Sequence, residues 1–196
     1  MKKKIILPKV LPVILAVSCL PLSPVLAASG EPAAEKNSAD TSELSAEDGL
    51  FGAFETVTLD GDAEDQDIFT EADLNMVNIW GTFCGPCIRE MPALGEIAEE
   101  YEEKGLQLIG IITDVTEAEN ETALEIVDYT GADYTHLVLS ETLMQGYLAE
   151  VQAVPTTVFL DREGKQVGEV YVGSRSKEDW CEIIDGLLEQ EEETEN

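Results

Sequence analysis

The chain has 196 residues, and 44% of them are hydrophobic, which is enough to bury the core of one ordinary domain. Its 41 acidic residues against 11 basic ones give a net charge of -30 at pH 7, which excludes nucleic acid as a partner. Such acidity predicts solubility and self-repulsion, and it points to no ligand by itself.

The first 27 residues have the layout of a secretory signal peptide. Lysines follow Met1, an apolar run extends from Val10 to Leu20, and small residues surround Ala27. The run is too short and too rich in proline for a membrane span, which needs about 20 apolar residues. We expect cleavage near Ala27. Lipidation of Cys19 is the first alternative, because the preceding residues loosely resemble a lipoprotein box, and uncleaved anchoring is the second. All three outcomes place the remaining chain outside the cytoplasm.

Two other segments lack the pattern of a folded element. Residues 28–50 contain mostly Ala, Glu, Ser, Asp and Thr, which predicts a flexible acidic linker. Residues 191–196 are an acidic tail. The intervening residues 51–190 are predicted to form a single domain.

Strand and helix patterns alternate along this domain. Strands are indicated by period-two or continuous apolar runs, and helices by apolar stripes that end at glycine. The predicted strands are 54–59, 76–83, 106–112, 135–139, 154–160 and 166–172, and the predicted helices are 86–104, 117–130, 141–150 and 176–189. This order predicts an α/β fold with a mixed sheet between helices, whose early strands are parallel because crossovers are right-handed.

Three cysteines follow the predicted signal segment: a close pair, Cys84 and Cys87, and a distant Cys181. An odd count with one close pair favours a redox pair and a bystander over a structural disulfide framework. Cys181 is expected to be a half-buried small hydrophobe, with a third redox thiol as the alternative. A zinc site would need four ligands, and only Cys181 and His136 remain beside the pair, so no metal is predicted. The lone His136 is expected to be structural.

The pair in Cys84-Gly85-Pro86-Cys87 follows the central strand 76–83 and opens the helix 86–104. Open α/β sheets place their sites at this end of a strand. Cys84 would occupy the exposed helix cap and attack the substrate disulfide, because free amides stabilise its thiolate. The buried Cys87 would then resolve the mixed disulfide. Pro86 suits the first helical turn. No histidine or other cation lies between the cysteines, which favours a reductant over a strong oxidant.

The residues around the pair resemble a known active-site motif. Residues 78–87, with the sequence NIWGTFCGPC, and the following Glu90-Met91-Pro92 are similar to the motif of the thioredoxin superfamily, and more narrowly of the TlpA/ResA-type extracytoplasmic thiol-disulfide oxidoreductases. The resemblance covers about residues 51–189. It implies a thioredoxin-like fold with a central mixed sheet flanked by helices, an N-terminal strand extension and an inserted helix at 117–130.

The resemblance also implies a substrate groove. Val154-Pro155-Thr156 resembles the loop whose proline is cis in this superfamily, and Gly173 resembles a glycine that lines the groove. The groove candidates are Trp80, Phe83, Val154, Thr156 and Gly173. For Trp80 a core position is favoured, because tryptophans on central strands usually pack. Phe83 stands where a tryptophan is more usual.

The group that moves protons is an open question in this motif. Asn78 stands where thioredoxins have a buried aspartate. Glu90 follows Cys87 by three residues on the same helix face, so it is a candidate proton relay. The favoured alternative for Glu90 is a solvated helix position, because acids are frequent throughout this chain.

These observations predict an extracytoplasmic oxidoreductase that reduces disulfides of exported proteins through a mixed disulfide. The resemblance implies that a membrane dithiol supplies the electrons. We expect no organic cofactor beside the redox-active cysteine pair, and we expect a monomer. One alternative is a peroxiredoxin-like peroxidase, whose Pro-x-x-x-Thr/Ser-x-x-Cys element this sequence lacks. Another is a copper-binding assembly factor, which would space its cysteines more widely and add a histidine.

Overall fold

The computed structural model describes residues 49–194. The predictions for segment 1–27, for Cys19 and for residues 28–48 lie outside the described residues. The predicted linker ends too late, because the amide of Leu50 donates to the carbonyl of Gly164 at 2.7 Å and its side chain packs on the core. The predicted tail begins too early, because the last helix continues to Thr194 through Glu and Gln, which are good helix formers.

The strands and helices form one five-stranded sheet, a small hairpin and flanking helices. The sheet has the order β5-β4-β3-β6-β7; β3, β4 and β5 are parallel, while β6 is antiparallel to both β3 and β7. This arrangement confirms the predicted α/β class. The strands are β1 (Glu55–Val57), β2 (Ala63–Asp65), β3 (Leu74–Trp80), β4 (Leu106–Ile112), β5 (Thr135–Val138), β6 (Thr156–Leu160) and β7 (Gln166–Val172). The helices are α1 (Gly85–Tyr101), α2 (Glu121–Thr130), α3 (Glu141–Gln145) and α4 (Lys177–Thr194), with 3-10 turns η1 (Gln66–Glu71), η2 (Glu102–Lys104) and η3 (Tyr147–Glu150).

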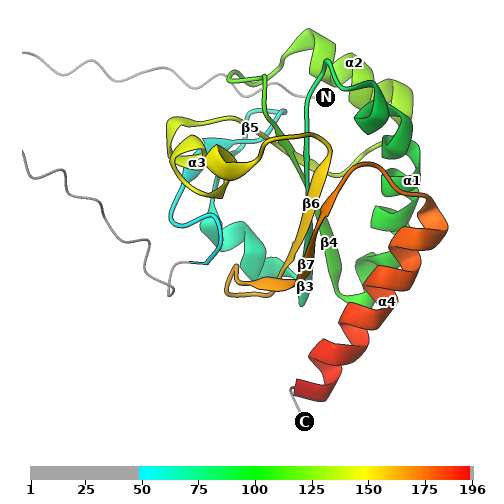
Figure 1. Ribbon diagram of the computed structural model, residues 1–196. Coiled ribbons are helices and arrows are strands. Elements are labelled where there is room, and N and C mark those ends of the chain that lie inside the picture. The colour runs from blue at the N-terminus through cyan, green and yellow to red at the C-terminus, as the bar shows by residue number, and fades with distance from the viewer. Residues whose placement is uncertain (1–48, 195–196) are drawn as a thin grey trace, which may run out of the picture. The chain divides into compact units, whose positions relative to one another are not determined.

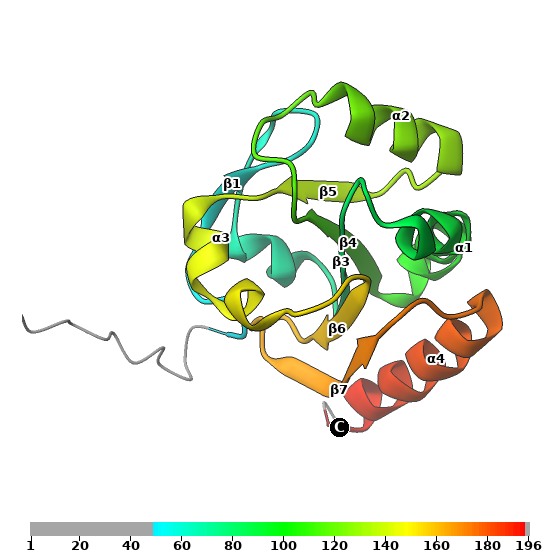
Figure 2. The same cartoon turned by 45° about the horizontal axis from the view of Figure 1, so that its top comes forward.

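Helices cover both faces of the sheet (Figure 1). On one face, α1 and α4 bury an apolar cluster that includes Met76, Leu94 and Trp180. On the other face, α3 and the segment before β1 bury a second cluster around Phe54 and Val77. Figure 2 shows α2 next to α1 at the β5 end of the sheet. All seven residues of β3 are buried, as expected of a central strand covered on both faces.

Two element boundaries decide where the site lies. β3 ends at Trp80, three residues before the predicted end, because residues 81–83 leave the sheet and Thr82 bonds instead to the carboxylate of Asp114. α2 begins at Glu121, four residues later than predicted, because the Asn120 side chain caps it by accepting from the amide of Ala123 at 3.1 Å. Within residues 49–194, no helix combines the length and the apolar composition needed to cross a bilayer.

Candidate active site

The cysteine pair lies at the start of α1, directly after the loop that leaves β3. Cys84 and Cys87 form a disulfide with an S–S distance of 1.98 Å. Cys84 is the N-cap of α1, and its sulfur accepts from the amide of Cys87 at 3.2 Å. Gly85 and Pro86 occupy the first helical positions. The sulfur that was predicted to attack therefore lies where the helix amides point.

Burial of the pair differs from the prediction in one respect. Cys84 is only 5% exposed, although it was expected at an exposed cap, and Cys87 is 1% exposed. The reason is that both cysteines pack with Trp80 and Met91 into a third apolar cluster beneath the loop. The order of accessibility still favours Cys84 as the sulfur that a substrate reaches first.

The predicted proline loop lies against the dithiol. The Val154–Pro155 peptide bond is cis, which is the isomer that the resemblance implied. The carbonyl oxygen of Val154 lies 3.5 Å from Cys84 Sγ, and the amide of Gly173 donates to the carbonyl of Pro155 at 2.8 Å. The fold thus brings three segments together that are distant in the sequence.

The predicted groove residues separate into surface and core. Phe83 is 72% exposed beside Cys84, and Val154 is half-buried. Thr156 is buried, and its hydroxyl donates to the carbonyl of Ala153 at 2.8 Å, so its side chain is not on the surface of a groove. Trp80 is completely buried, which confirms the favoured core position and removes Trp80 from the groove candidates. It lies below the motif because alternate residues of β3 point toward α1.

His136 and Trp80 form a buried pair under the dithiol. The indole of Trp80 donates to His136 Nδ1 at 3.2 Å, and His136 Nε2 lies 3.0 Å from the carbonyl of Ala132. Burial lowers the pKa of His136 to about 4, so the ring is neutral and both nitrogens are engaged. A Cβ on Gly110 would lie 2.2 Å from Nδ1, which explains a glycine in the middle of β4. His136 is therefore structural, as predicted.

Glu90 is buried, which overturns the favoured expectation of a solvated position. Its Oε1 accepts from the indole of Trp180 at 2.8 Å and from the amide of Arg175 at 2.7 Å. Its Oε2 finds no hydrogen-bond partner within residues 49–194. Burial raises the pKa of Glu90, and the bonds from Arg175 and Trp180 oppose that effect. A carboxyl group that is buried and protonates readily, three residues after Cys87, suits proton exchange.

Asn78 is also buried, on β3, where its side-chain amide donates to the hydroxyl of Thr157 on β6 at 3.0 Å. This bond ties two central strands together below the dithiol. An asparagine side chain does not titrate near neutral pH, so of the two residues considered for proton transfer Glu90 is the one that can exchange a proton.

Sequence reasoning missed two charged residues at the site. Asp114, after β4, accepts from the amide of Thr82 at 3.0 Å and also from its hydroxyl, which fixes the loop before Cys84. A Cβ on Gly85 would lie 3.3 Å from Nη1 of Arg89, so the Arg89 guanidinium lies against the turn between the cysteines. The sequence signal that could have placed Arg89 at the site is its spacing of four residues from Gly85, because residues four apart are neighbours on the surface of a helix.

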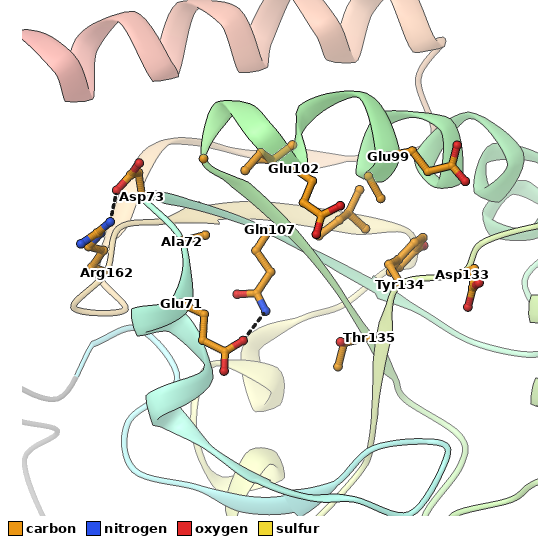
Figure 3. A pocket seen from close by; sticks show the side chains of 14 residues that line it. Glu71, Ala72, Asp73, Glu99, Glu102, Gln107, Asp133, Tyr134, Thr135 and Arg162 are labelled. Atoms are coloured by element: carbon orange, nitrogen blue, oxygen red, sulfur yellow. Dashed lines mark hydrogen bonds and ion pairs between the residues drawn. The ribbon is translucent and has the colours of Figure 1, made fainter.

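A separate hollow of about 410 Å³ lies at the opposite end of the sheet. It is lined by residues at the amino ends of β3, β4 and β5, and Figure 3 shows carboxylates of Glu71, Glu102 and Asp133 around it. Figure 3 also shows Arg162 paired with Asp73 and Gln107 bonded to Glu71. No cysteine lines this hollow.

The remaining cysteine lies apart from the pair. Cys181 on α4 is half-buried, packs against the cluster between the sheet and α1, and has no disulfide partner within residues 49–194. In the same described range, no group of three or more His, Cys, Asp or Glu side chains is arranged to hold a metal ion.

Comparison with known proteins identifies the family. The model of the Redoxin family matches residues 37–183 of the chain. The chain belongs to the Redoxin family. Among curated relatives of this Redoxin protein, the thiol-disulfide oxidoreductase ResA of Bacillus cereus is 30% identical over 114 residues, which are 58% of this chain and 61% of ResA. The thioredoxin-like protein YneN of Bacillus subtilis is 26% identical over 110 residues, or 56% of this chain and 62% of YneN. The chain thus spans about three fifths of the length of these relatives.

Solved structures share the fold of this Redoxin protein. A thiol:disulfide interchange protein of the thioredoxin family from Chlorobium tepidum has a TM-score of 0.59 at 24% identity, over 69% of this chain and 93% of that chain. StoA from Bacillus subtilis has a TM-score of 0.53 at 18% identity, over 68% of this chain and 97% of that chain. These findings confirm the resemblance to the thioredoxin superfamily and its ResA/TlpA type.

Proposed function

We propose that the chain is an extracytoplasmic thiol-disulfide oxidoreductase that reduces disulfides of exported proteins. The observation that carries this proposal is the position of Cys84 Sγ, at the N-cap of α1 and 3.5 Å from the Val154 carbonyl. A reactive sulfur at that point meets amide donors on one side and the cis-proline loop on the other. The names of the ResA relatives, which are thiol-disulfide oxidoreductases, support the same reaction class.

The reaction needs only the two sulfurs and a proton acceptor. The Cys84 thiolate attacks one sulfur of the client disulfide, the client S–S bond breaks, and the client thiolate leaves and takes up a proton. Cys87 then loses its proton and attacks Cys84, which releases the second client thiol and forms the Cys84–Cys87 disulfide. Two electrons pass from the dithiol to the client. Glu90 is the group proposed to accept the proton of Cys87.

The client would be held as an extended segment across the proline loop. Phe83 and Val172 are large exposed apolar side chains, and Val154 is half-buried. Extended peptides are bound through main-chain hydrogen bonds, with contacts to alternate side chains for specificity. Exposed apolar side chains mark surfaces that bind other proteins. A partly unfolded exported protein offers such segments.

Features of the sequence support the proposed direction and place of the reaction. No charged residue lies between Cys84 and Cys87, which favours a reductant. The basic and apolar first 27 residues favour export, by cleavage or by attachment to the envelope. An external membrane dithiol would then reduce the Cys84–Cys87 disulfide after each turnover, and the protein is proposed to act as a monomer without an organic cofactor.

Reduction of a protein disulfide by the purified chain tests the proposal. The prereduced chain should cleave the disulfides of insulin in stoichiometric amount, and Cys84→Ser should not, because the attacking sulfur is gone. Cys181→Ser serves as the matched control and should react like the wild type. Failure of the wild-type chain to reduce insulin, together with rapid reaction with hydrogen peroxide or tight binding of copper, would reject the proposal.

A further inference from the structure

The charge pattern at the start of α1 differs from that of every other helix and 3-10 turn in residues 49–194. Each of the others has at least one acid in its first turn. α1 has none, although the chain contains 41 acidic residues. The guanidinium of Arg89 lies there instead, with its Nη1 3.3 Å from the point that a Cβ on Gly85 would occupy.

This placement opposes the usual electrostatic preference of helices. The amino end of a helix carries partial positive charge, so acids are stabilising there and cations are not. A cation at this position is explained if an anion forms at the neighbouring Cys84. The disulfide form of Cys84 is neutral, but the reduced form ionises to a thiolate at the N-cap, next to Gly85.

We propose that Arg89 stabilises the Cys84 thiolate and so sets the fraction of the reduced protein that can attack a disulfide. The inference rests on the proposed function, because only an exchange reaction makes this thiolate useful. Arg89 is exposed, so the attraction is partly screened by solvent. It adds a modest stabilisation to that of the helix amides, which remains compatible with a reductant.

The other charged groups near the dithiol are engaged elsewhere. Asp114, after β4, is bonded to the amide and the hydroxyl of Thr82. Glu90 is buried and accepts from Arg175 and Trp180. The Arg175 guanidinium donates to the carbonyl of Gly173 at 3.1 Å and lies over two aromatic rings. Because these groups are already bonded, Arg89 is the cation whose charge can stabilise Cys84 when its thiol ionises.

The test measures the reactivity of Cys84 without any client protein. In a Cys87→Ala background, reduced full-length protein is alkylated with iodoacetamide, a neutral reagent that Arg89 cannot attract by charge. Modification of the Cys84 peptide is followed by mass spectrometry between pH 5 and pH 10. The variants are Arg89→Gln, Arg89→Lys and, as a control with the same loss of charge, Arg162→Gln at the opposite end of the sheet.

Arg89→Gln should slow alkylation about two- to fivefold below the pKa of the Cys84 thiol, which corresponds to one charge near a helix end. At high pH the rates should converge, because the thiol is then ionised in every variant. Arg89→Lys should restore the rate, about 1 M salt should shrink the difference, and Arg162→Gln should match the wild type.

Equal rates for Arg89→Gln and the wild type, or an equal loss in Arg162→Gln, would overturn the inference. A slower rate that persists at high pH would also overturn it, because it would indicate a change of access to Cys84. Since no client is present, these results are separate from failure of the insulin assay. As a second measurement, the Cys84–Cys87 disulfide of Arg89→Gln should equilibrate with glutathione at a more reducing potential than the wild type, because its thiolate is less stabilised.

Discussion

The two ends of the central sheet differ in what they offer a ligand. At the carboxyl end of β3, two buried sulfurs meet helix amides, a cis-proline loop and an exposed Phe83. At the amino ends of β3, β4 and β5 lies a hollow of about 410 Å³ with charged walls and an ion pair between Arg162 and Asp73. The hollow lies at the end without the dithiol.

The difference shows that shape alone does not locate this site. Disulfide exchange takes place between sulfurs on two chains, so it needs an accessible sulfur and a surface for an extended segment more than it needs a cavity. In the parallel part of the sheet, the end where strands lead into helices provides the amides that stabilise a thiolate. The opposite end of β4 and β5 follows the carboxyl ends of α1 and α2, which present carbonyl groups and not amides.

The largest effect is expected at the dithiol end from Cys87→Ala. Turnover should fall to background, and a mixed disulfide through Cys84 should accumulate, because the resolving thiol is absent. Non-reducing gels of a reaction with a disulfide-containing client, followed by mass spectrometry, measure this. Cys181→Ala should leave turnover unchanged. If Cys87→Ala released free client thiols at the wild-type rate, a group other than Cys87 would be resolving the mixed disulfide.

The packing below the dithiol is tested by Gly110→Ala. The added methyl would meet His136 Nδ1 and the indole of Trp80, so unfolding in urea should show a loss of about 1–3 kcal/mol. Gly186→Ala in α4 meets nothing within 4 Å and should instead raise stability by about 0.5–1 kcal/mol, because alanine favours a helix. Effects of the same sign at both positions would contradict this account.

Glu90→Gln tests the buried carboxyl through the pH dependence of stability. Burial raises the pKa of Glu90 in the folded protein, so the folded state holds this proton more tightly than the unfolded state. The wild type therefore loses stability as the pH rises from the unfolded pKa, about 4.3, to the higher folded value, and Glu90→Gln lacks this loss. Urea unfolding at several pH values should show the variant gaining relative to the wild type across that window. A difference in unfolding free energy between the variant and the wild type that stays constant with pH would be inconsistent with a raised pKa of Glu90.

The smallest effect is expected at the amino end from Arg162→Gln. The side chains of Arg162 and Asp73 are 54% and 48% exposed, and surface ion pairs contribute at most about 1 kcal/mol. The midpoint temperature of thermal unfolding should shift little, and the rate of insulin reduction should not change. A loss of activity in this variant would show that the amino end takes part in the function.

The residues that were predictable from the sequence are those with a local signal. Cys84, Cys87 and Pro155 lie in short motifs, and the succession of most strands and helices along the chain followed from their periodicity. The α/β class was therefore predicted, and the cysteine pair was placed at the end of a central strand. Glu90 was misjudged because its burial depends on Trp180, which is 90 residues away and approaches only after α4 packs on the sheet. Thr82 left its predicted strand for the same kind of reason, since its partner Asp114 follows another strand.

Both tryptophans of the chain lie close to this chemistry. Trp80 packs in the same apolar cluster as the disulfide, and Trp180 donates to Glu90. A disulfide in contact with an indole quenches its fluorescence by accepting an electron. The protein therefore carries an internal optical reporter: emission should rise when the dithiol is reduced, and the rise should disappear in Trp80→Phe. Its redox titration can be read from the unlabelled chain.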